Sequence, residues 1–377
     1  MKRKGFLYDE IVDIDKIRDM FNHIKNNCKS KKAVNEFMMY KEEMCSDIYL
    51  RLKQRDYMFY YYHIFLITEP KYRIIMAEVI SDKVANQMVS SYILIPSIES
   101  SLIDTNVATR IDKGSRYAVN AIKKYINIIK YERKEVYVLK LDISKYFYNI
   151  DHKILINKLS DKIKDPEALN IIKDILSSTN KEYVNEGIKK LKENEIKRIS
   201  SLNISFNEKE KKINEISSIP TYQKDKGLPI GNMTSQILAI FYLNDVDHFI
   251  KETLGYKYYV RYMDDLFLIS TNKEKLLSDK YLIIKEIEKE KLKTNRKTNI
   301  YKLSVGVSFL GLTFKLWGGH LIVTPRSETL RRINNRLSNL MKYDYEAYLL
   351  ALPSYKGYIM NSDVRKFNRK EINDIME

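Results

Sequence analysis

Cysteine is scarce in this chain, and long apolar runs are missing. The 377 residues include two cysteines, Cys28 and Cys45, which have neither CxxC spacing nor a histidine cluster. This pattern argues against a zinc site and favours a reducing, cytoplasmic compartment. No stretch of about 18 uninterrupted apolar residues occurs, and the basic start Met1-Lys2-Arg3-Lys4 leads into no long apolar region. We therefore expect a cytoplasmic chain that neither spans a membrane nor is secreted.

Positive charge and tyrosine, by contrast, are abundant. Lys and Arg number 66 against 49 Asp and Glu, which gives a formal net charge of +17. An excess of this size favours a polyanionic partner such as nucleic acid. The 29 tyrosines could stack on bases, although most should be packing residues. The hydrophobic content of 44% is enough for a large core, and the length allows two or three subdomains.

Two adjacent carboxylates stand between two strand-like segments. Tyr262-Met263-Asp264-Asp265 is preceded by an aromatic and apolar run, residues 258–262, and followed by another, residues 266–269. This pattern predicts a hairpin with the acids at its tip. Desolvating two like charges side by side raises the pKa of one of them. A multivalent cation that neutralises both would explain why the pair is kept between buried strands.

A third carboxylate occurs upstream, at the end of another predicted strand. Residues 136–143 are rich in β-branched and aromatic side chains, and the strand ends at Asp142. In isolation, an aspartate at a strand end is typical of a turn or a helix cap. Between the two acidic segments, the glycine-containing loop 226–236 opens an apolar helix predicted from Ile237 to about Phe249. Such a loop lets a sugar-phosphate or a base approach the backbone closely.

In this order, the acid, the glycine loop and the paired acids resemble the reverse transcriptases. The strand with Asp142 resembles their first metal-binding motif, residues 227–236 the segment that contacts template and nucleotide, and residues 262–265 the catalytic hairpin. Residues 308–314 resemble the primer grip, and residues 69–75 resemble the basic fingers segment. The resemblance covers roughly residues 60–360. It implies an α+β right-hand polymerase with fingers, a palm of antiparallel sheet plus helices, and a helical thumb.

The resemblance also implies a set of site residues. Two Mg²⁺ ions, with Mn²⁺ as an alternative, would be held by Asp142, Asp264, Asp265 and the backbone carbonyl of Ile143. Lys297 resembles the residue that protonates pyrophosphate, with Lys291, Lys293 and Arg296 as nearby alternatives. The remaining assignments are, for the nucleotide, Lys71, Arg73, Phe147, Ile230, Gly231, Gln236, Tyr262 and Met263, and, for the primer grip, Phe309, Leu310 and Gly311.

Phe147 stands five residues after Asp142, where reverse transcriptases place an aromatic steric gate. A ring beneath C2′ of the sugar would exclude a ribose hydroxyl, which implies a DNA product. The alternative is a core phenylalanine, and Tyr146 and Tyr148 on either side leave the choice of residue open. Lys71 and Arg73 would neutralise the triphosphate, or they are simply solvent-exposed cations.

We expect four regions along the chain. These are an N-terminal helical extension over 1–58, fingers over 59–135, a palm over 136–315 and a helical thumb over 316–377. The palm includes a lysine- and glutamate-rich insertion at about 181–218, which is either a solvated helical excursion or a nucleic-acid contact. Within the first two regions we predict helices over 15–24, 33–52 and 81–94, with a strand-turn-strand around Pro70.

The predicted thumb helix begins with Thr324 as its cap and Pro325 at its first position. Its apolar residues Leu330, Ile333, Leu337 and Met341 recur at helical spacing. The cations Arg331, Arg332 and Arg336 fall largely on other faces. This suits a helix with one side packed and another turned toward phosphates.

One departure from the family pattern bears on biological role. Retroviral and group II intron enzymes carry Gln-Gly in the glycine loop, where this chain has Ile230-Gly231. The variant resembles the enzymes of diversity-generating retroelements and of bacterial abortive-infection and defence groups. We expect no RNase H or endonuclease module after the thumb, and a structured non-coding RNA as template, with dNTPs and a DNA product. An accessory protein or homo-oligomer is compatible with this. Antiviral defence is favoured over mutagenic retrohoming, and a catalytically silent RNA-binding module is the rival from another class.

Overall fold

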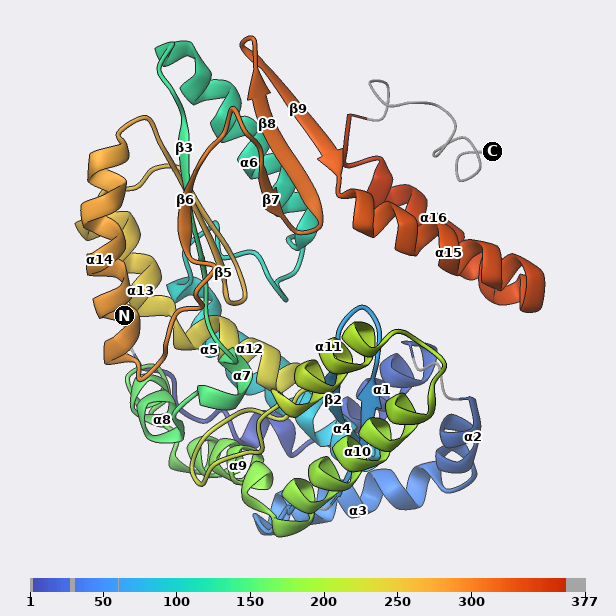
Figure 1. Cartoon of the computed structure of the whole chain (residues 1–377). Coiled ribbons are helices and arrows are strands. Elements are labelled where there is room, and N and C mark those ends of the chain that lie inside the picture. The colour runs from blue at the N-terminus through green and yellow to red at the C-terminus, as the bar shows by residue number, and fades with distance from the viewer. Residues whose placement is uncertain (1–2, 28–30, 60, 364–377) are drawn as a thin grey trace. The chain divides into compact units, whose positions relative to one another are not determined.

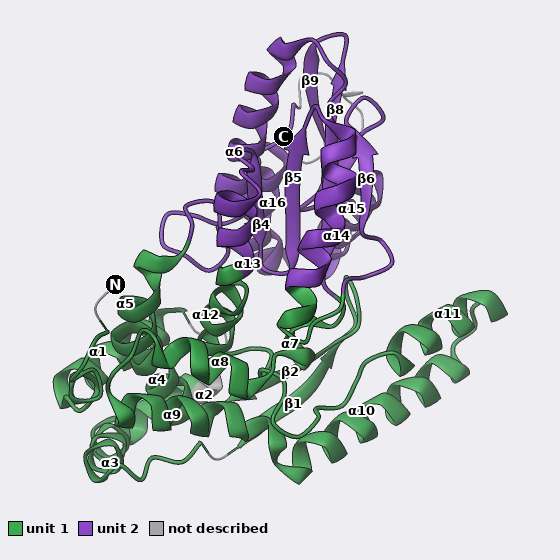
Figure 2. Cartoon of the chain, turned by 90° about the vertical axis from the view of Figure 1, so that its left-hand side faces the viewer, with its two compact units in different colours: residues 1–102, 144–245, 287–293 green, residues 103–143, 246–286, 294–377 purple. Residues whose placement is uncertain are grey.

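The computed structural model of the protein describes residues 3–27, 31–59 and 61–363 (Figure 1). Cys28 and the last residues of the predicted thumb, 364–377, lie outside this range, whereas Cys45 is buried and free. Helices and antiparallel strands form two compact units (Figure 2). Unit 1 comprises residues 1–102, 144–245 and 287–293, and unit 2 comprises residues 103–143, 246–286 and 294–377. Across the described residues, every helix is too short or too polar to cross a bilayer.

Unit 1 begins with three helices: α1 (Ile14–Asn27), α2 (Lys31–Met39) and α3 (Lys41–Gln54). The first covers the predicted helix over 15–24. The single helix predicted over 33–52 is wrong, because Tyr40 leaves helical angles (φ −118°, ψ 25°) and separates α2 from α3. On α2, Phe37 stacks on Phe21 of α1 with ring centroids 4.2 Å apart. This tertiary contact outweighs the continuous local pattern.

A two-stranded hairpin follows, with β1 (Tyr62–Ile67) antiparallel to β2 (Arg73–Glu78). The helix predicted over 81–94 is α4 (Ile80–Met88), which continues through a π-helical segment, η2 (Val89–Leu94), into α5 (Ile95–Ile98). The charged insertion folds as α10 (Glu182–Ser201) and α11 (Phe206–Ser217), which lie side by side in both views. Val184 and Ile188 of α10 are buried against Tyr62 and Ile74 of the hairpin. The insertion is therefore helical, but one face of α10 is packed rather than solvated.

The rest of unit 1 is helical. Asp151 caps α8 (His152–Ser160), and Asp165 caps α9 (Pro166–Ser177), each through a carboxylate that accepts from a backbone N–H. The glycine loop leads into α12 (Met233–Tyr242), which is almost wholly buried. The helix predicted from 237 to 249 therefore begins earlier and ends at Tyr242, where Leu243 (φ −91°, ψ 14°) separates it from α13 (Asn244–His248) and the π-helical η6 (Phe249–Thr253). The remaining short helices of unit 1 are η1 (Asp9–Ile11), η3 (Glu99–Ser101), α7 (Tyr146–Asn149) and η5 (Ser178–Asn180), whereas η4 (Lys130–Glu132) and η6 belong to unit 2.

Unit 2 is built on a four-stranded antiparallel sheet in the order β4-β5-β3-β6. Its strands are β3 (Tyr137–Asp142), β4 (Tyr259–Tyr262), β5 (Asp265–Ser270) and β6 (Asn299–Lys302). Val138, Val260 and Phe267 from this sheet share one apolar core with Ile122 and Ile126 of α6 (Ser115–Ile129). Alternation along each strand therefore buries one face of the sheet under α6. Helix α14 (Lys273–Lys289) follows β5 along the chain.

A three-stranded meander and a helix pair complete unit 2. The meander is β7 (Val307–Phe309), β8 (Leu312–Trp317) and β9 (His320–Pro325), and the helices are α15 (Ser327–Tyr343) and α16 (Tyr345–Ile359), which run side by side in Figure 1. Leu330, Ile333 and Leu337 pack against α16, as their spacing predicts.

Two details of the predicted thumb helix are wrong. Thr324 and Pro325 do not cap it, because they still pair with Thr313 and Leu312 of β8, and the helix begins at Ser327 after Arg326 as N-cap. Strand pairing here outweighs the local signal for a helix start. Met341 does not join the apolar stripe, since 61% of it is exposed. Residues 316–325, assigned to the thumb by sequence, belong to β8 and β9.

Candidate active site

Three aspartates meet at one end of the unit 2 sheet. Asp142 is the last residue of β3 and Asp265 the first of β5, and the two are Cα partners in the antiparallel register. Asp264 lies beside them in the turn that joins β4 to β5. All three are partly exposed, while the neighbouring Leu266, Leu141 and Ile143 are buried. The structure thus places the three aspartates that the sequence singles out at the same end of a buried sheet.

The tight turn that carries Asp264 has an unusual backbone. Met263 has φ +54°, in the left-handed region that a non-glycine residue seldom adopts. Tyr262 pairs with Asp265 across the turn. Both Tyr262 and Met263 are half-buried. The positive φ of Met263 therefore lets the chain reverse its direction within two residues. Asp264 and Asp265 follow Met263 directly.

Lys140 is a charged neighbour of these acids that the sequence reasoning missed. Its ammonium lies 3.5 Å from Oδ1 of Asp265 and donates to the carbonyl of Ser308, 3.2 Å away. Lys140 precedes Asp142 by two positions on β3, so both side chains point to the same face of the sheet. That alternation is the signal in the sequence that could have identified it.

Residues 294–298 run along the end of β3. Asn295 donates its backbone N–H to the Asp142 carbonyl (2.6 Å), and Ile143 forms an isolated bridge with Thr294. Lys297 is exposed in this segment. Among its alternatives, Lys291 is engaged by Asp151 of unit 1 at 2.6 Å. Ile143 itself has a buried side chain and could offer only its backbone carbonyl.

The chemistry of this donor set fits a hard divalent cation. Three carboxylates and a backbone carbonyl are oxygen ligands of the kind that Mg²⁺ takes. In the described part of the chain, however, no three His, Cys, Asp or Glu side chains converge closely enough to enclose an ion. The Lys140 ammonium faces Asp265 instead. An ion bound by this set would compete with the Lys140 ammonium for Asp265.

The predicted nucleotide-binding residues of the glycine loop lie against the hairpin in unit 1. Met76 of β2 donates its N–H to the carbonyl of Ile230 at 2.8 Å. Gly231 has φ +138°, and a Cβ there would come within 2.8 Å of the Met76 carbonyl, so only glycine fits. Lys71 and Arg73 are exposed on the same hairpin, and Gln236 is half-buried in the first turns of α12. The hairpin of β1 and β2, which carries Lys71 and Arg73 and is called the basic hairpin below, therefore lies in the same unit as the glycine loop.

The three adjacent aromatic residues after β3 have different surroundings. Tyr146 is 2% exposed and donates its hydroxyl to the Ala239 carbonyl at 2.6 Å. Tyr148 packs on Tyr222, with ring centroids 4.9 Å apart. Phe147 remains half-buried, and its carbonyl accepts from the N–H of Leu228 in the glycine loop at 2.7 Å. Of the three, Phe147 is the ring with neither a hydroxyl bond nor a place in a core cluster among the contacts described.

The predicted primer grip combines a buried core residue with a half-buried turn. Phe309 is buried against Phe267, with ring centroids 5.0 Å apart. Leu310 (φ +49°) and Gly311 (φ +81°) form the turn from β7 to β8. A Cβ on Gly311 would lie 2.6 Å from the Tyr358 hydroxyl of α16, so the turn needs glycine at this position. On α15, Arg331, Arg332 and Arg336 are exposed, whereas Leu330, Ile333 and Leu337 are buried.

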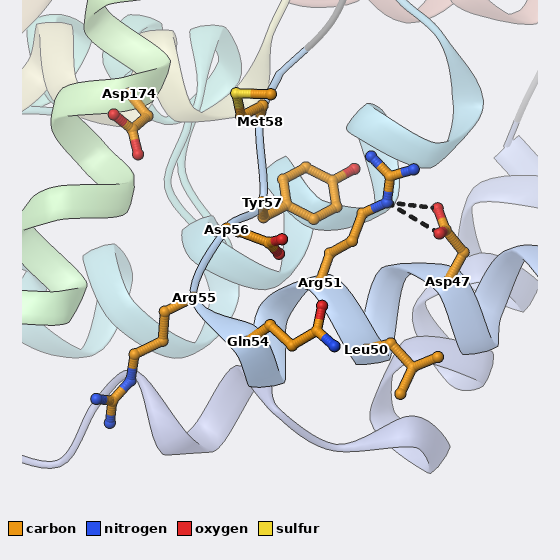
Figure 3. Close-up of a pocket in the computed structure, with 9 residues that line it drawn as sticks. All are labelled: Asp47, Leu50, Arg51, Gln54, Arg55, Asp56, Tyr57, Met58 and Asp174. Carbon is orange, nitrogen blue, oxygen red and sulfur yellow. Dashed lines mark hydrogen bonds and ion pairs between the residues drawn. The ribbon is translucent and has the colours of Figure 1, made fainter.

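Two cavities of unit 1 lie away from these residues. One of about 670 Å³ lies between α3, the segment after it and α9 (Figure 3). Arg51 and Asp47, which line it, are joined by an ion pair of 2.9 Å. A second cavity of about 420 Å³ is lined by residues near Phe6 and Pro166. Neither cavity supplies a residue that the sequence assigns to a site.

A family model described as reverse transcriptase (RNA-dependent DNA polymerase) matches residues 68–314. The chain belongs to the reverse transcriptases. The matched region contains the three aspartates, the glycine loop, and the turn and second strand of the basic hairpin, and it ends within β8, before the helix pair. The predicted α+β class is confirmed, and the domain is that of an RNA-directed DNA polymerase, a nucleotidyltransferase. Members of this family use divalent metal ions, with RNA as template and DNA as product.

No curated protein matches this reverse transcriptase sequence. Among solved structures, telomerase from Candida albicans with a fragment of telomeric RNA is similar at 13% identity and a TM-score of 0.42, over 89% of this chain and 58% of that chain. Apo telomerase from Candida tropicalis, truncated from its C-terminal domain, is similar at 15% identity and a TM-score of 0.41, over 70% and 55%. The reverse transcriptase therefore spans less than two thirds of either telomerase chain.

Proposed function

We propose that this protein adds dNTPs to a 3′-hydroxyl on an RNA template, with Asp142, Asp264 and Asp265 as the metal-binding residues. The observation that carries the proposal is the pairing of Asp142 with Asp265 across adjacent strands, with Asp264 in the neighbouring turn. Two Mg²⁺ ions, or Mn²⁺, would supply charge that stabilises the attacking and leaving oxygens. The Ile143 carbonyl is a further oxygen donor for them. A silent RNA-binding module would have no need for three carboxylates at one sheet end.

The other residues take roles that the family resemblance implies. Lys71 and Arg73, exposed on the hairpin, neutralise the triphosphate through charge-assisted hydrogen bonds. Lys297 donates a proton to the departing pyrophosphate. Phe147 excludes the ribose 2′-hydroxyl, and Ile230, Gly231, Gln236, Tyr262 and Met263 contact the nucleotide. The turn of Leu310 and Gly311, supported by Phe309, holds the primer strand.

For biological role, we propose a bacterial enzyme that copies a structured non-coding RNA in antiviral defence. The Ile230-Gly231 variant of the glycine loop supports this, and it fits the reverse transcriptase of a diversity-generating retroelement as well. The two cysteines, one of them buried and free, suit a reducing cytoplasm. Sequencing the RNA and DNA that co-purify with the protein would separate the two roles. A variable-repeat target would favour retrohoming, and a fixed non-coding RNA would favour defence.

Asp264→Asn tests the metal assignment. The change removes one ligand charge and keeps the shape of the side chain, so primer extension should fall by about 10²-fold or more. Melting temperature and RNA affinity should stay at the wild-type level. Asp112→Asn is the matched control, because Asp112 is exposed in the same unit and asparagine tolerates its positive φ. Wild-type incorporation by Asp264→Asn would refute the assignment.

A further inference from the structure

A buried ion pair stands directly behind the turn that carries Asp264. Arg261 of β4 and Asp247 of α13 both have side chains that are 0% exposed. The guanidinium grips the carboxylate with two bonds, Nε to Oδ1 at 2.7 Å and Nη2 to Oδ2 at 2.6 Å. The Tyr259 hydroxyl donates to the same carboxylate at 2.6 Å. All of these residues belong to unit 2.

The third nitrogen of the guanidinium reaches the turn itself. Nη1 of Arg261 donates to the carbonyl of Met263 at 2.9 Å. Met263 is the residue at φ +54°, and the next residue along the chain is Asp264. A hydrogen bond from a fixed cation to this carbonyl stabilises a peptide orientation that the backbone alone disfavours. The bond therefore acts on the peptide that directly precedes the paired acids.

Arg261 is also held from its backbone side. Its N–H donates to the Thr105 carbonyl at 2.9 Å, and its carbonyl accepts from Val107 at 3.1 Å. The Arg261 backbone is thus held by Thr105 and Val107, and its guanidinium is held by Asp247 of α13 and by the Met263 carbonyl. A planar fork of five N–H donors suits this task, because it can bind a carboxylate on one edge and a carbonyl with another nitrogen. A lysine ammonium has no such geometry.

Stability alone gives little reason for such a pair. Taking a guanidinium and a carboxylate out of water is costly, and replacement of a buried pair by apolar residues is often neutral or stabilising. Beyond the pair itself, the guanidinium donates to the Met263 carbonyl, a contact that bears on function. The geometry of the Arg261–Asp247 network is therefore suited to stabilising the turn that carries the proposed metal-binding residues.

We propose that Arg261, oriented by Asp247, is a positioning residue that fixes the Met263 carbonyl and thereby sets the direction of Asp264 and Asp265. The inference rests on the proposed metal-binding role of these acids. Arg261 contacts neither nucleotide nor metal, and acts only through the turn. Outer-shell partners of this kind typically change metal affinity or activity by about 10–100-fold when they are removed.

The test removes the pair as a whole, in the full chain. Arg261→Met with Asp247→Leu leaves no unpaired buried charge but deletes the bond to Met263. Lys158→Met with Glu290→Leu is the matched control, because that largely buried pair (2.7 Å) belongs to unit 1, whereas the turn belongs to unit 2. Each protein is examined by thermal melting, hydrogen exchange at residues 262–265, Mn²⁺ binding by electron paramagnetic resonance, and primer extension.

We expect the Arg261/Asp247 double variant to fold, with a melting temperature lowered by the loss of the acceptor of the Tyr259 hydroxyl, and to show faster exchange in the turn. Its Mn²⁺ affinity should fall by about tenfold and primer extension by at least as much, whereas the control should keep both. A folded double variant with wild-type exchange and Mn²⁺ affinity would overturn the proposal. If wild type bound Mn²⁺ but did not extend primers, the proposed function would fail while the exchange and Mn²⁺ measurements still tested the positioning role.

A second variant covers the case in which the double variant does not fold. Arg261→Lys keeps a positive charge against Asp247, but one ammonium cannot make the bidentate grip and also reach Met263. Exchange at residues 262–265 should therefore quicken, and Mn²⁺ affinity should fall, while the protein stays folded. Wild-type values of both in Arg261→Lys would overturn the proposal equally.

Discussion

Tyr146, Phe147 and Tyr148 follow β3 as consecutive aromatic residues, but each has different neighbours in the folded chain. Tyr146 is fixed in the core by its bond to Ala239, and Tyr148 packs with Tyr222. Phe147 lies between them on the short helix α7 and keeps part of its ring exposed. The sequence could not choose among the three, because spacing from Asp142 alone shifts by one residue with a small change in the turn. Tyr146 is buried and Tyr148 packs against a core cluster, so Phe147 stays the residue that we propose as the steric gate.

Phe147→Ala tests the steric gate. Without the ring, ribonucleotides should compete with dNTPs, and each 1.4 kcal/mol of lost discrimination is about tenfold in relative kcat/KM. If Phe147 only packs, the change should instead lower the free energy of unfolding by roughly 3–5 kcal/mol and leave sugar selectivity alone. Incorporation of dNTP against rNTP, measured beside thermal melting, separates the outcomes. Tyr146→Phe is the control, since it loses the hydroxyl bond but keeps its ring. Unaltered selectivity in a folded Phe147→Ala protein would refute the gate.

The residues closest to the acids illustrate what a sequence reveals at this scale. Asp142, Asp264 and Asp265 could be found because Asp142 and Asp265 sit at the ends of strands with a clear apolar pattern, and Asp264 lies in the turn beside them. Lys140 was detectable in principle from its alternation with Asp142. Asp247 was not, because its contact with Arg261 joins a helix to a strand across a loop, and nothing local marks an aspartate that will be buried against a guanidinium. Long-range pairing of this kind becomes visible only in the folded chain.

At the scale of elements, α4 contains a carboxylate whose ionisation opposes folding. Asp82 is buried and accepts a hydrogen bond from the Tyr57 hydroxyl at 3.0 Å. Burial raises its pKa to about 6, and burial together with Asp82 raises the pKa of Glu78 at the end of β2. At pH values between the ordinary pKa of aspartate and about 6, Asp82 is protonated in the folded protein but ionised in the unfolded chain. This group therefore favours the fold at low pH, and its contribution is lost as pH rises through that window.

Asp82→Asn removes this dependence. The asparagine variant should gain stability relative to wild type as pH rises from about 4 to about 6.5, by on the order of 1–3 kcal/mol. Urea unfolding at several pH values measures the difference. Asp19→Asn, on an exposed position of α1, controls for the loss of one negative charge. Parallel stability curves for wild type and Asp82→Asn would show that Asp82 titrates normally in the fold.

Element boundaries were predictable only where one physical signal dominated. The strands around Asp142 and Asp264 could be predicted from their runs of apolar, β-branched and aromatic side chains. Helix α1 could be predicted from the amphipathic spacing of its residues. The start of α15 did not, because Thr324 and Pro325 carry a good helix-start signal and yet pair with β8. Likewise, the break at Tyr40 follows from the stacking of Phe37 on Phe21, which no local preference encodes. In both cases a tertiary contact decided between two locally acceptable structures.

At the scale of the whole molecule, the chain passes repeatedly between its two compact units. Each unit is assembled from three stretches of sequence, so no single cut in the chain separates them (Figure 2). The three acids and helices α15 and α16 belong to unit 2, and the basic hairpin and the glycine loop belong to unit 1. Composition cannot detect such a division, because neither unit corresponds to a continuous window with its own charge or apolar content.

The positive charge of the molecule leads to a prediction about RNA affinity. A net charge of +17 predicts that binding weakens steeply with salt, in proportion to the phosphates contacted. The exposed face of α15 carries Arg331, Arg332 and Arg336 opposite its packed side. If these arginines contact phosphates, replacing all three by glutamine should reduce the slope of log Kd against log salt by about 2. Melting temperature should hardly change, because none of the three is buried.

The charged insertion supplies the matched comparison. Lys189, Lys190 and Lys197 are equally exposed on α10, and their replacement by glutamine removes the same charge from the molecule. If RNA affinity depends only on the net charge of the molecule, the two triple variants should weaken RNA binding alike. If α15 contacts the backbone directly, the arginine variant alone should change the slope, because counterion release depends on local contacts rather than on net charge. A slope changed by the lysines and not by the arginines would move the binding surface from α15 to the insertion.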